Sequence, residues 1–272
     1  MAMQLIALLS VLILNLTSVF AATANEAYGG DINTGCPLGS DIYQYSCPQA
    51  EAIIFSWVEQ AVSSDPRMAA SLLRLHFHDC FVNARGPTWE VQMGRKDSIT
   101  ASKVGANNNI PGPNSTVDVL VSKFENVGLT LQDMVALSGA HTIGKARCST
   151  FSSRLQSNSI SDGPFVDVEF VASLQQLCSG QGNSNRIAHL DLTTPATFDN
   201  QYYVNLLSGE GLLPSDQTLV SGNDQTRQIV ETYVENPYAF FEDFKISMIR
   251  MGSLGSDAQS NGQIRRDCRT IN

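Results

Sequence analysis

The chain has 272 residues, of which 43% are hydrophobic and 16% are charged. This composition is typical of a globular protein with a sizeable core and one or two domains. The formal net charge of −9 argues against a nucleic-acid binder, because no basic face is available for phosphates.

The first 24 residues have the features of a secretory signal. An apolar run from Leu5 to Phe20 leads into the small residues Ala21, Ala22 and Ala24, as the core of a signal leads into its cleavage site. No Lys or Arg precedes the run, which departs from the usual pattern. A membrane anchor is the alternative, but the run is short for a spanning helix. We expect a signal over residues 1–24, one domain over 25–272 and no membrane association.

Secretion would make the cysteines disulfide candidates. An even number of cysteines allows full pairing, but their spacing leaves the connectivity open. The sequon Asn114-Ser115-Thr116 lies in a loop rich in Pro and Gly, where a glycan acceptor would be accessible. The six cysteines are Cys36, Cys47, Cys80, Cys148, Cys178 and Cys268.

Two helices are predicted in the N-terminal third. Apolar residues at helical spacing mark the first, and Asp65-Pro66 is a favourable start for the second. A loop is expected over residues 107–115. The first helix carries Ile53, Ile54, Trp57, Val58 and Ala61, and the second carries Met68, Leu72, Leu75 and Cys80 on roughly one side.

Two further helices have clear start signals or amphipathic patterns. Thr130 with Asp133 three residues later resembles a capping box, and Met134, Leu137 and His141 then share a face. The stretch NPYAFFEDFKISMIRMG predicts a last amphipathic helix. Alternation of β-branched residues is sparse, so we predict a mainly α fold.

Arg74 and His78 are the first pair with a chemical interpretation. They stand four residues apart, which places both on one helix face. The histidine can move a proton between the oxygens of a peroxide, and the arginine can stabilise the developing negative charge. Ordinary hydrogen bonding is the alternative. A zinc hydrolase using His76, His78 and a carboxylate is disfavoured, because His76 lies off this face and HExxH is absent.

His141 follows an apolar helix and sits among small residues in GAHTIG, which would let a flat cofactor approach the backbone. An ordinary core histidine is the alternative. As a partner of the Arg74 and His78 face, His141 could bind a haem iron from the opposite side.

Acids and hydroxyls also gather in two later segments. Asp191, Thr194, Thr197 and Asp199 supply oxygen ligands suited to Ca²⁺, with ordinary turn chemistry as the alternative. Asp216, expected in a loop, could accept a hydrogen bond from a metal-bound histidine, although nothing local decides this.

Together these stretches resemble the secreted plant haem peroxidases of class III. The matching blocks stand in family order and cover most of the chain from Tyr43 to the C-terminus. The resemblance implies a mainly α fold with the haem between a distal and a proximal lobe. The blocks are CPQAEAII, ASLLRLHFHDCFV, GPTWEVQMGRKDS, DMVALSGAHTIGKARC, AHLDLTTPATFDNQYY, LLPSDQTLV and FKISMIRMG with GQIRRDCR.

The resemblance implies roles for the residues around a haem b. His78 is similar to the distal acid–base catalyst, Arg74 to the group that stabilises the transition state, and Phe77 to the aromatic residue flanking the pocket. His141 resembles the proximal ligand of the iron, and Asp216 its hydrogen-bond partner.

Other implied roles concern substrate, calcium and the disulfides. Pro111 resembles the proline at the entrance for reducing substrates. Asp79 and the carbonyl of Val82 resemble the start of a distal calcium site, and Cys148 with Cys178 keeps a family disulfide. The implied proximal calcium site comprises Thr142, Asp191, Thr194, Thr197 and Asp199.

The chain departs from the family after Asn83. The family continues with a Gly-Cys-Asp segment and several dozen further residues, whereas here Ala84-Arg85 leads at once into the GPTWEV block. We therefore expect an incomplete distal lobe, a lost distal calcium site and no asparagine to orient His78. Cys47, Cys80 and Cys268 would lack their family partners, and Cys36 is extra.

The resemblance implies a secreted, monomeric peroxidase that reduces hydrogen peroxide and oxidises small phenolic donors by one-electron steps. The extracellular space or cell wall is the expected location, with the vacuole as an alternative. The alternative function is a truncated, catalytically impaired or non-folding variant with no enzymatic role.

Overall fold

The computed structural model describes residues 43–65, 68, 87, 89–90, 92, 94–100, 102–155, 166–179, 185–254, 262–267 and 270–272. The expected signal, the second helix beyond Met68 and the join after Asn83 lie outside these residues. Several predicted residues also lie outside them: Cys36, Arg74, His76, Phe77, His78, Asp79, Cys80, Val82 and Cys268.

The described part of the chain is mainly helical, as predicted. Two short strands, β1 (Lys145–Arg147) and β2 (Ile187–His189), form an antiparallel pair in which Lys145 faces His189. No helix in this part is long and apolar enough to cross a bilayer. The helices are α2 (Ala50–Ser64), α4 (Lys103–Asn109), α5 (Val117–Glu125), α6 (Leu131–Ser138), α7 (Val168–Cys178), α8 (Gln201–Leu207), α9 (Pro214–Ser221), α10 (Asp224–Glu235) and α11 (Pro237–Gly252).

Local sequence signals set the N-terminal starts of α6 and α11. Thr130 Oγ1 accepts from the Asp133 backbone N–H, and the Thr130 N–H donates to Asp133 Oδ2, so the predicted capping box is present. The side chain of Asn236 caps α11 by accepting from the Ala239 N–H, and Pro237 occupies its first turn. The loop expected over residues 107–115 begins later, because α4 extends to Asn109.

The helix predicted around Ile53 is confirmed as α2, but its apolar face is only partly buried. Val58 and Val62 are buried, whereas Ile53 and Ile54 are 48% and 41% exposed and Trp57 is 70% exposed. Helical spacing shows which residues share a face, but not whether another element covers it.

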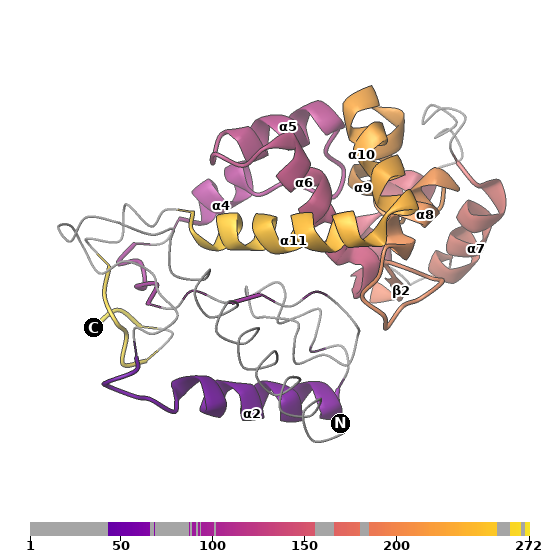
Figure 1. The fold of residues 1–272 in the computed structure, drawn as a ribbon. Coiled ribbons are helices and arrows are strands. Elements are labelled where there is room, and N and C mark those ends of the chain that lie inside the picture. The colour runs from indigo at the N-terminus through magenta and orange to yellow at the C-terminus, as the bar shows by residue number, and fades with distance from the viewer. Residues whose placement is uncertain are drawn as a thin grey trace, which may run out of the picture. The chain divides into compact units, whose positions relative to one another are not determined.

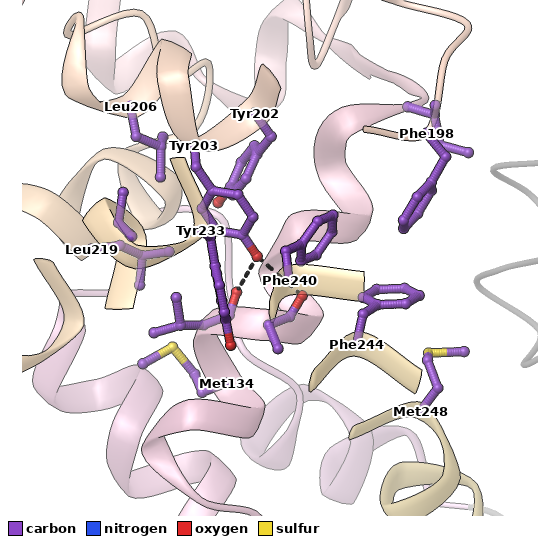
Figure 2. Close-up of a cluster of buried hydrophobic side chains, with 14 of the residues drawn as sticks. Met134, Phe198, Tyr202, Tyr203, Leu206, Leu219, Tyr233, Phe240, Phe244 and Met248 are labelled. Carbon is purple, nitrogen blue, oxygen red and sulfur yellow. Dashed lines mark hydrogen bonds between the residues drawn. The ribbon is translucent and has the colours of Figure 1, made fainter. Parts of the chain in front are cut away.

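The main core is aromatic and lies where α6, α8, α10 and α11 meet (Figures 1 and 2). Tyr203 lies 5.0 Å from both Tyr233 and Phe240, measured between ring centroids. Its hydroxyl donates to the carbonyls of Val135 and Ala136 at 3.0 and 3.3 Å. A buried tyrosine needs such partners, so this core joins α8 firmly to the helix that precedes His141.

A second cluster contains Cys148, Phe151, Phe170 and Leu174. The disulfide between Cys148 and Cys178 fastens the end of α7 to this cluster. Cys47 is a free, exposed thiol.

Candidate functional site

His141 lies in a short 3-10 helix, Gly139–Thr142, that continues directly from α6. Gly144, which follows, has φ of 108°, a left-handed conformation that suits glycine and turns the chain into β1. The capped start of α6 and this turn fix the backbone on both sides of His141.

The imidazole of His141 is held by Asp216 from another helix. The distance from His141 Nδ1 to Asp216 Oδ1 is 2.8 Å. Asp216 lies in the first turn of α9 rather than in a loop, because Pro214 starts a helix there. The Asp216 side chain is 3% exposed and that of His141 is 38% exposed. The carboxylate therefore engages the ring from the protein interior, while part of the ring remains accessible.

Tyr202 is a third member of this site that the sequence reasoning missed. Its hydroxyl donates to Asp216 Oδ1 at 3.1 Å, and its ring meets that of His141 edge-on with 6.2 Å between centroids. Burial, and then the charge of Asp216, hold the pKa of Tyr202 well above its ordinary value, so the phenol stays a donor. The sequence contains two adjacent tyrosines, Tyr202 and Tyr203, directly after Asn200-Gln201. Nothing local indicates which of the two rings reaches Asp216.

Gly139 has a packing role in this structure. A Cβ at this position would collide with Tyr203 Oη and with the ring of Phe240, both of which are buried. The sequence interpretation of small residues around His141 assigned them to cofactor approach. For Gly139, close packing against two aromatic side chains is the requirement that the structure shows.

Replacing Gly139 by alanine should destabilise the fold by about 2 kcal/mol, as overpacking typically does. Denaturant unfolding of the two proteins would measure this. Gly128→Ala is not a suitable control because φ there is 87°, whereas Gly252→Ala meets no atom within 4 Å and should change stability little. If Gly139→Ala and the unsubstituted chain are equally stable, Tyr203 and Phe240 must move to accommodate the added methyl group.

The predicted oxygen-rich cluster lies next to His141. The Thr142 and Thr194 hydroxyls each lie 3.1–3.3 Å from carboxylate oxygens of both Asp191 and Asp199. Asp191 and Thr142 are fully buried. The side chain of Asn205, which the sequence analysis did not select, donates to Asp191 Oδ1 at 3.0 Å.

These oxygens form the kind of set that a hard cation prefers. Among the described residues, no group of three or more His, Cys, Asp or Glu side chains could hold a metal, so the two threonines are essential to this candidate. Thr197 joins the turn through its backbone N–H, which donates to the Thr194 carbonyl at 3.0 Å. Because Thr142 follows His141, the two sites share one segment.

Other predicted positions are more peripheral. Pro111 is exposed. Nearby, the Pro113 carbonyl accepts from the Ser215 N–H at 2.9 Å, which ties this loop to the helix carrying Asp216.

The predicted glycan acceptor, Asn114, is exposed and accepts from Ser153 Oγ at 2.8 Å. Arg74, Phe77 and His78 lie outside the described residues, so the structure relates only His141 with Asp216 and the oxygen-rich cluster.

Comparisons with known proteins place this chain in a wider group. A family model described as peroxidase matches residues 82–236. The chain is 48% identical to Peroxidase 40 of Arabidopsis thaliana over 321 residues, which cover 91% of each protein. It is 38% identical to Peroxidase 15 of the same plant, covering 96% of each. It is 39% identical to Peroxidase 4 of Vitis vinifera, covering 88% of this chain and 94% of the relative.

Proposed function

This chain belongs to the class III family of plant haem peroxidases, and from that premise we propose that it reduces hydrogen peroxide while oxidising small phenolic donors in two one-electron steps. Family membership makes it an oxidoreductase of the peroxidase type. It favours an active enzyme over the alternative of a variant without enzymatic role.

The proximal residues fit a haem b. A histidine that binds a metal typically donates its other ring N–H to a carboxylate, which fixes the ring and strengthens it as a ligand. The 2.8 Å contact between His141 Nδ1 and the buried Asp216 has this form and leaves Nε2 to bind iron. This contact is the observation that carries the proposal. When bound, the haem would supply the electrons that reduce the peroxide.

The remaining residues take roles implied by the family. We infer that His78 moves the proton between the peroxide oxygens and that Arg74 stabilises the charge on the leaving oxygen. Phe77 would flank the pocket, and Pro111, exposed on its loop, would border the entrance for the phenolic donor. We also infer a secreted, monomeric protein that carries a glycan on Asn114.

The absorption spectrum of the purified full chain, before and after peroxide, tests the proposed function. We expect a Soret band that shifts when peroxide is added and returns when a phenolic donor follows. Failure to bind haem would overturn the proposal. A band that does not respond to peroxide would overturn the role of Arg74 and His78.

We also propose that the chain lacks an internal block after about residue 83. The alignment with Peroxidase 40 extends over 321 residues, whereas this chain has 272, so at least 49 positions (321 less 272) have no counterpart here. Asp79 and Val82 would then lack the remaining ligands of a distal calcium site. Sequencing the mature transcript tests this proposal, and additional codons after Asn83 would contradict it.

We further infer that Thr142, Asp191, Thr194, Thr197 and Asp199 bind Ca²⁺. Calcium at about 100 times its Kd should stabilise the fold by about 2.7 kcal/mol. Removal of calcium by a chelator should therefore lower the melting temperature, and Asp191→Asn should remove most of this effect.

The matched control for the calcium experiment is Asp167→Asn. Asp167 caps α7 by accepting from the Phe170 N–H at 2.7 Å, and asparagine caps equally well. This variant should keep the full response to the chelator. If the melting temperature of the unsubstituted chain is the same with and without calcium, the site is refuted.

A further inference from the structure

We infer that Tyr202 is a positioning residue that moderates the hydrogen bond between Asp216 and His141, and through it the strength of His141 as an iron ligand. This inference rests on the proposed function, because it concerns the histidine that would bind haem. It deepens that function by adding a second donor to the proximal pair.

The geometry places both donors on one carboxylate oxygen. Asp216 Oδ1 is 2.8 Å from His141 Nδ1 and 3.1 Å from Tyr202 Oη. Within the described part of the chain, the other oxygen, Oδ2, accepts a single long bond of 3.4 Å, from the Leu213 N–H. Most of the donor strength around Asp216 therefore converges on Oδ1.

Burial strengthens the hydrogen bonds that Asp216 accepts from His141 and Tyr202. Tyr202 is 2% exposed and Asp216 is 3% exposed, so bulk water competes little for the carboxylate. A hydrogen bond in such surroundings is electrostatically stronger than one in water. The ring of Tyr202 is also held in place, because it packs edge-on against Tyr203 with 5.0 Å between centroids.

Two donors on one oxygen weaken each other, since each draws on the same negative charge. The Tyr202 hydroxyl therefore limits how strongly Asp216 can pull on the Nδ1 proton of His141. Because that pull raises the basicity of a ligating histidine, losing the hydroxyl should make His141 a stronger donor to iron. Losing the Asp216 charge should have the opposite effect.

The first test uses the full chain without haem. In Tyr202→Phe, the proton resonance of His141 Nδ1–H should move downfield at constant pH, because the bond to Asp216 shortens. The matched control is Tyr233→Phe, which removes a phenol that donates to Asp243 at 2.8 Å, a bond of the same kind elsewhere. The control should leave the His141 resonance in place.

Replacing Tyr202 by 3-fluorotyrosine provides a second variant that keeps both ring and hydroxyl. Its phenol is a stronger donor, so the same resonance should move upfield. Opposite shifts in the two variants support the inference, and if one variant folds poorly, the shift of the other in its predicted direction still tests it. An unchanged resonance in either folded variant, or equal shifts in both, would overturn it.

The haem-loaded protein gives an independent readout. The iron–histidine stretching frequency of the reduced form should rise in Tyr202→Phe and fall in Asp216→Asn. A general loss of packing would lower it in both, which would overturn the inference. A chain that binds no haem would instead overturn the proposed function, while the resonance of the haem-free chain would still test Tyr202.

Discussion

Replacing His141 by alanine should abolish stable haem binding and reduce peroxidase activity by more than about 100-fold. Loss of a hydrogen-bonding partner behind a metal ligand already costs 10–100-fold, and this change removes the ligand itself. Asp216 and Tyr202 would remain folded around a space where the imidazole had been. The Soret absorbance per chain and the rate of donor oxidation would measure the effect.

Imidazole added to His141→Ala should restore part of the Soret band, since it can replace the missing ring. The matched control is His189→Ala, which also removes a partly buried histidine, this time from β2. Among the described residues, no group hydrogen-bonds to the His189 Nδ1, so the His189→Ala variant should bind haem normally. Full haem binding by His141→Ala would assign the iron ligand to another residue.

Replacing Asp133 by alanine should lower the free energy of unfolding by about 3 kcal/mol. Besides capping α6, this buried carboxylate accepts from Ser247 Oγ at 2.8 Å and from Arg250 Nη1 at 3.0 Å, both on α11. Removing one partner of a buried ion pair typically costs about 3–5 kcal/mol. The lower end applies, because the Arg250 side chain is 54% exposed and regains water.

The effect of this change should depend on pH. Burial alone would raise the pKa of Asp133, but hydrogen bonds from Thr130, Ser247 and Arg250 outweigh it and lower the pKa below its ordinary value of 3.8. The stabilisation is therefore complete above pH 3.8 and disappears as the pH falls through the lowered pKa of the folded state.

Denaturant unfolding at several pH values would test this prediction. The stability difference between the two proteins should be constant near neutral pH and should shrink in acid. As a control, Asp118→Ala removes an exposed acid from the first turn of α5 and should change stability by less than about 0.5 kcal/mol. A difference that stays constant into acid would show that the charge of Asp133 contributes nothing.

Signals within a few residues of one another determined much of this protein. Thr130 with Asp133 set the start of α6, and Asn236-Pro237 set the start of α11. Caps and turns act over one helical turn, so they can be read directly from the chain. The family blocks added the expected partners of His141, and the structure brings Asp216 to it.

Other features depended on segments far apart in the chain. His141 and Asp216 are 75 residues apart, and Asp133 meets Arg250 across 117 residues. Such contacts follow from how α6, α8, α9 and α11 pack, which no local pattern specifies. The exposed face of α2 shows the same limit, because periodicity located Trp57 on a helix but not what covers it.

The sequence by itself determined the mainly helical class and the capped start of α6, and its resemblance to the family predicted that His141 pairs with Asp216. Only the tertiary structure decided that Tyr202 shares a carboxylate oxygen with His141 and that Gly139 must stay small against Tyr203. The reason is physical: helix starts are set by neighbouring backbone groups, whereas the partners of a buried hydroxyl are set by packing between helices.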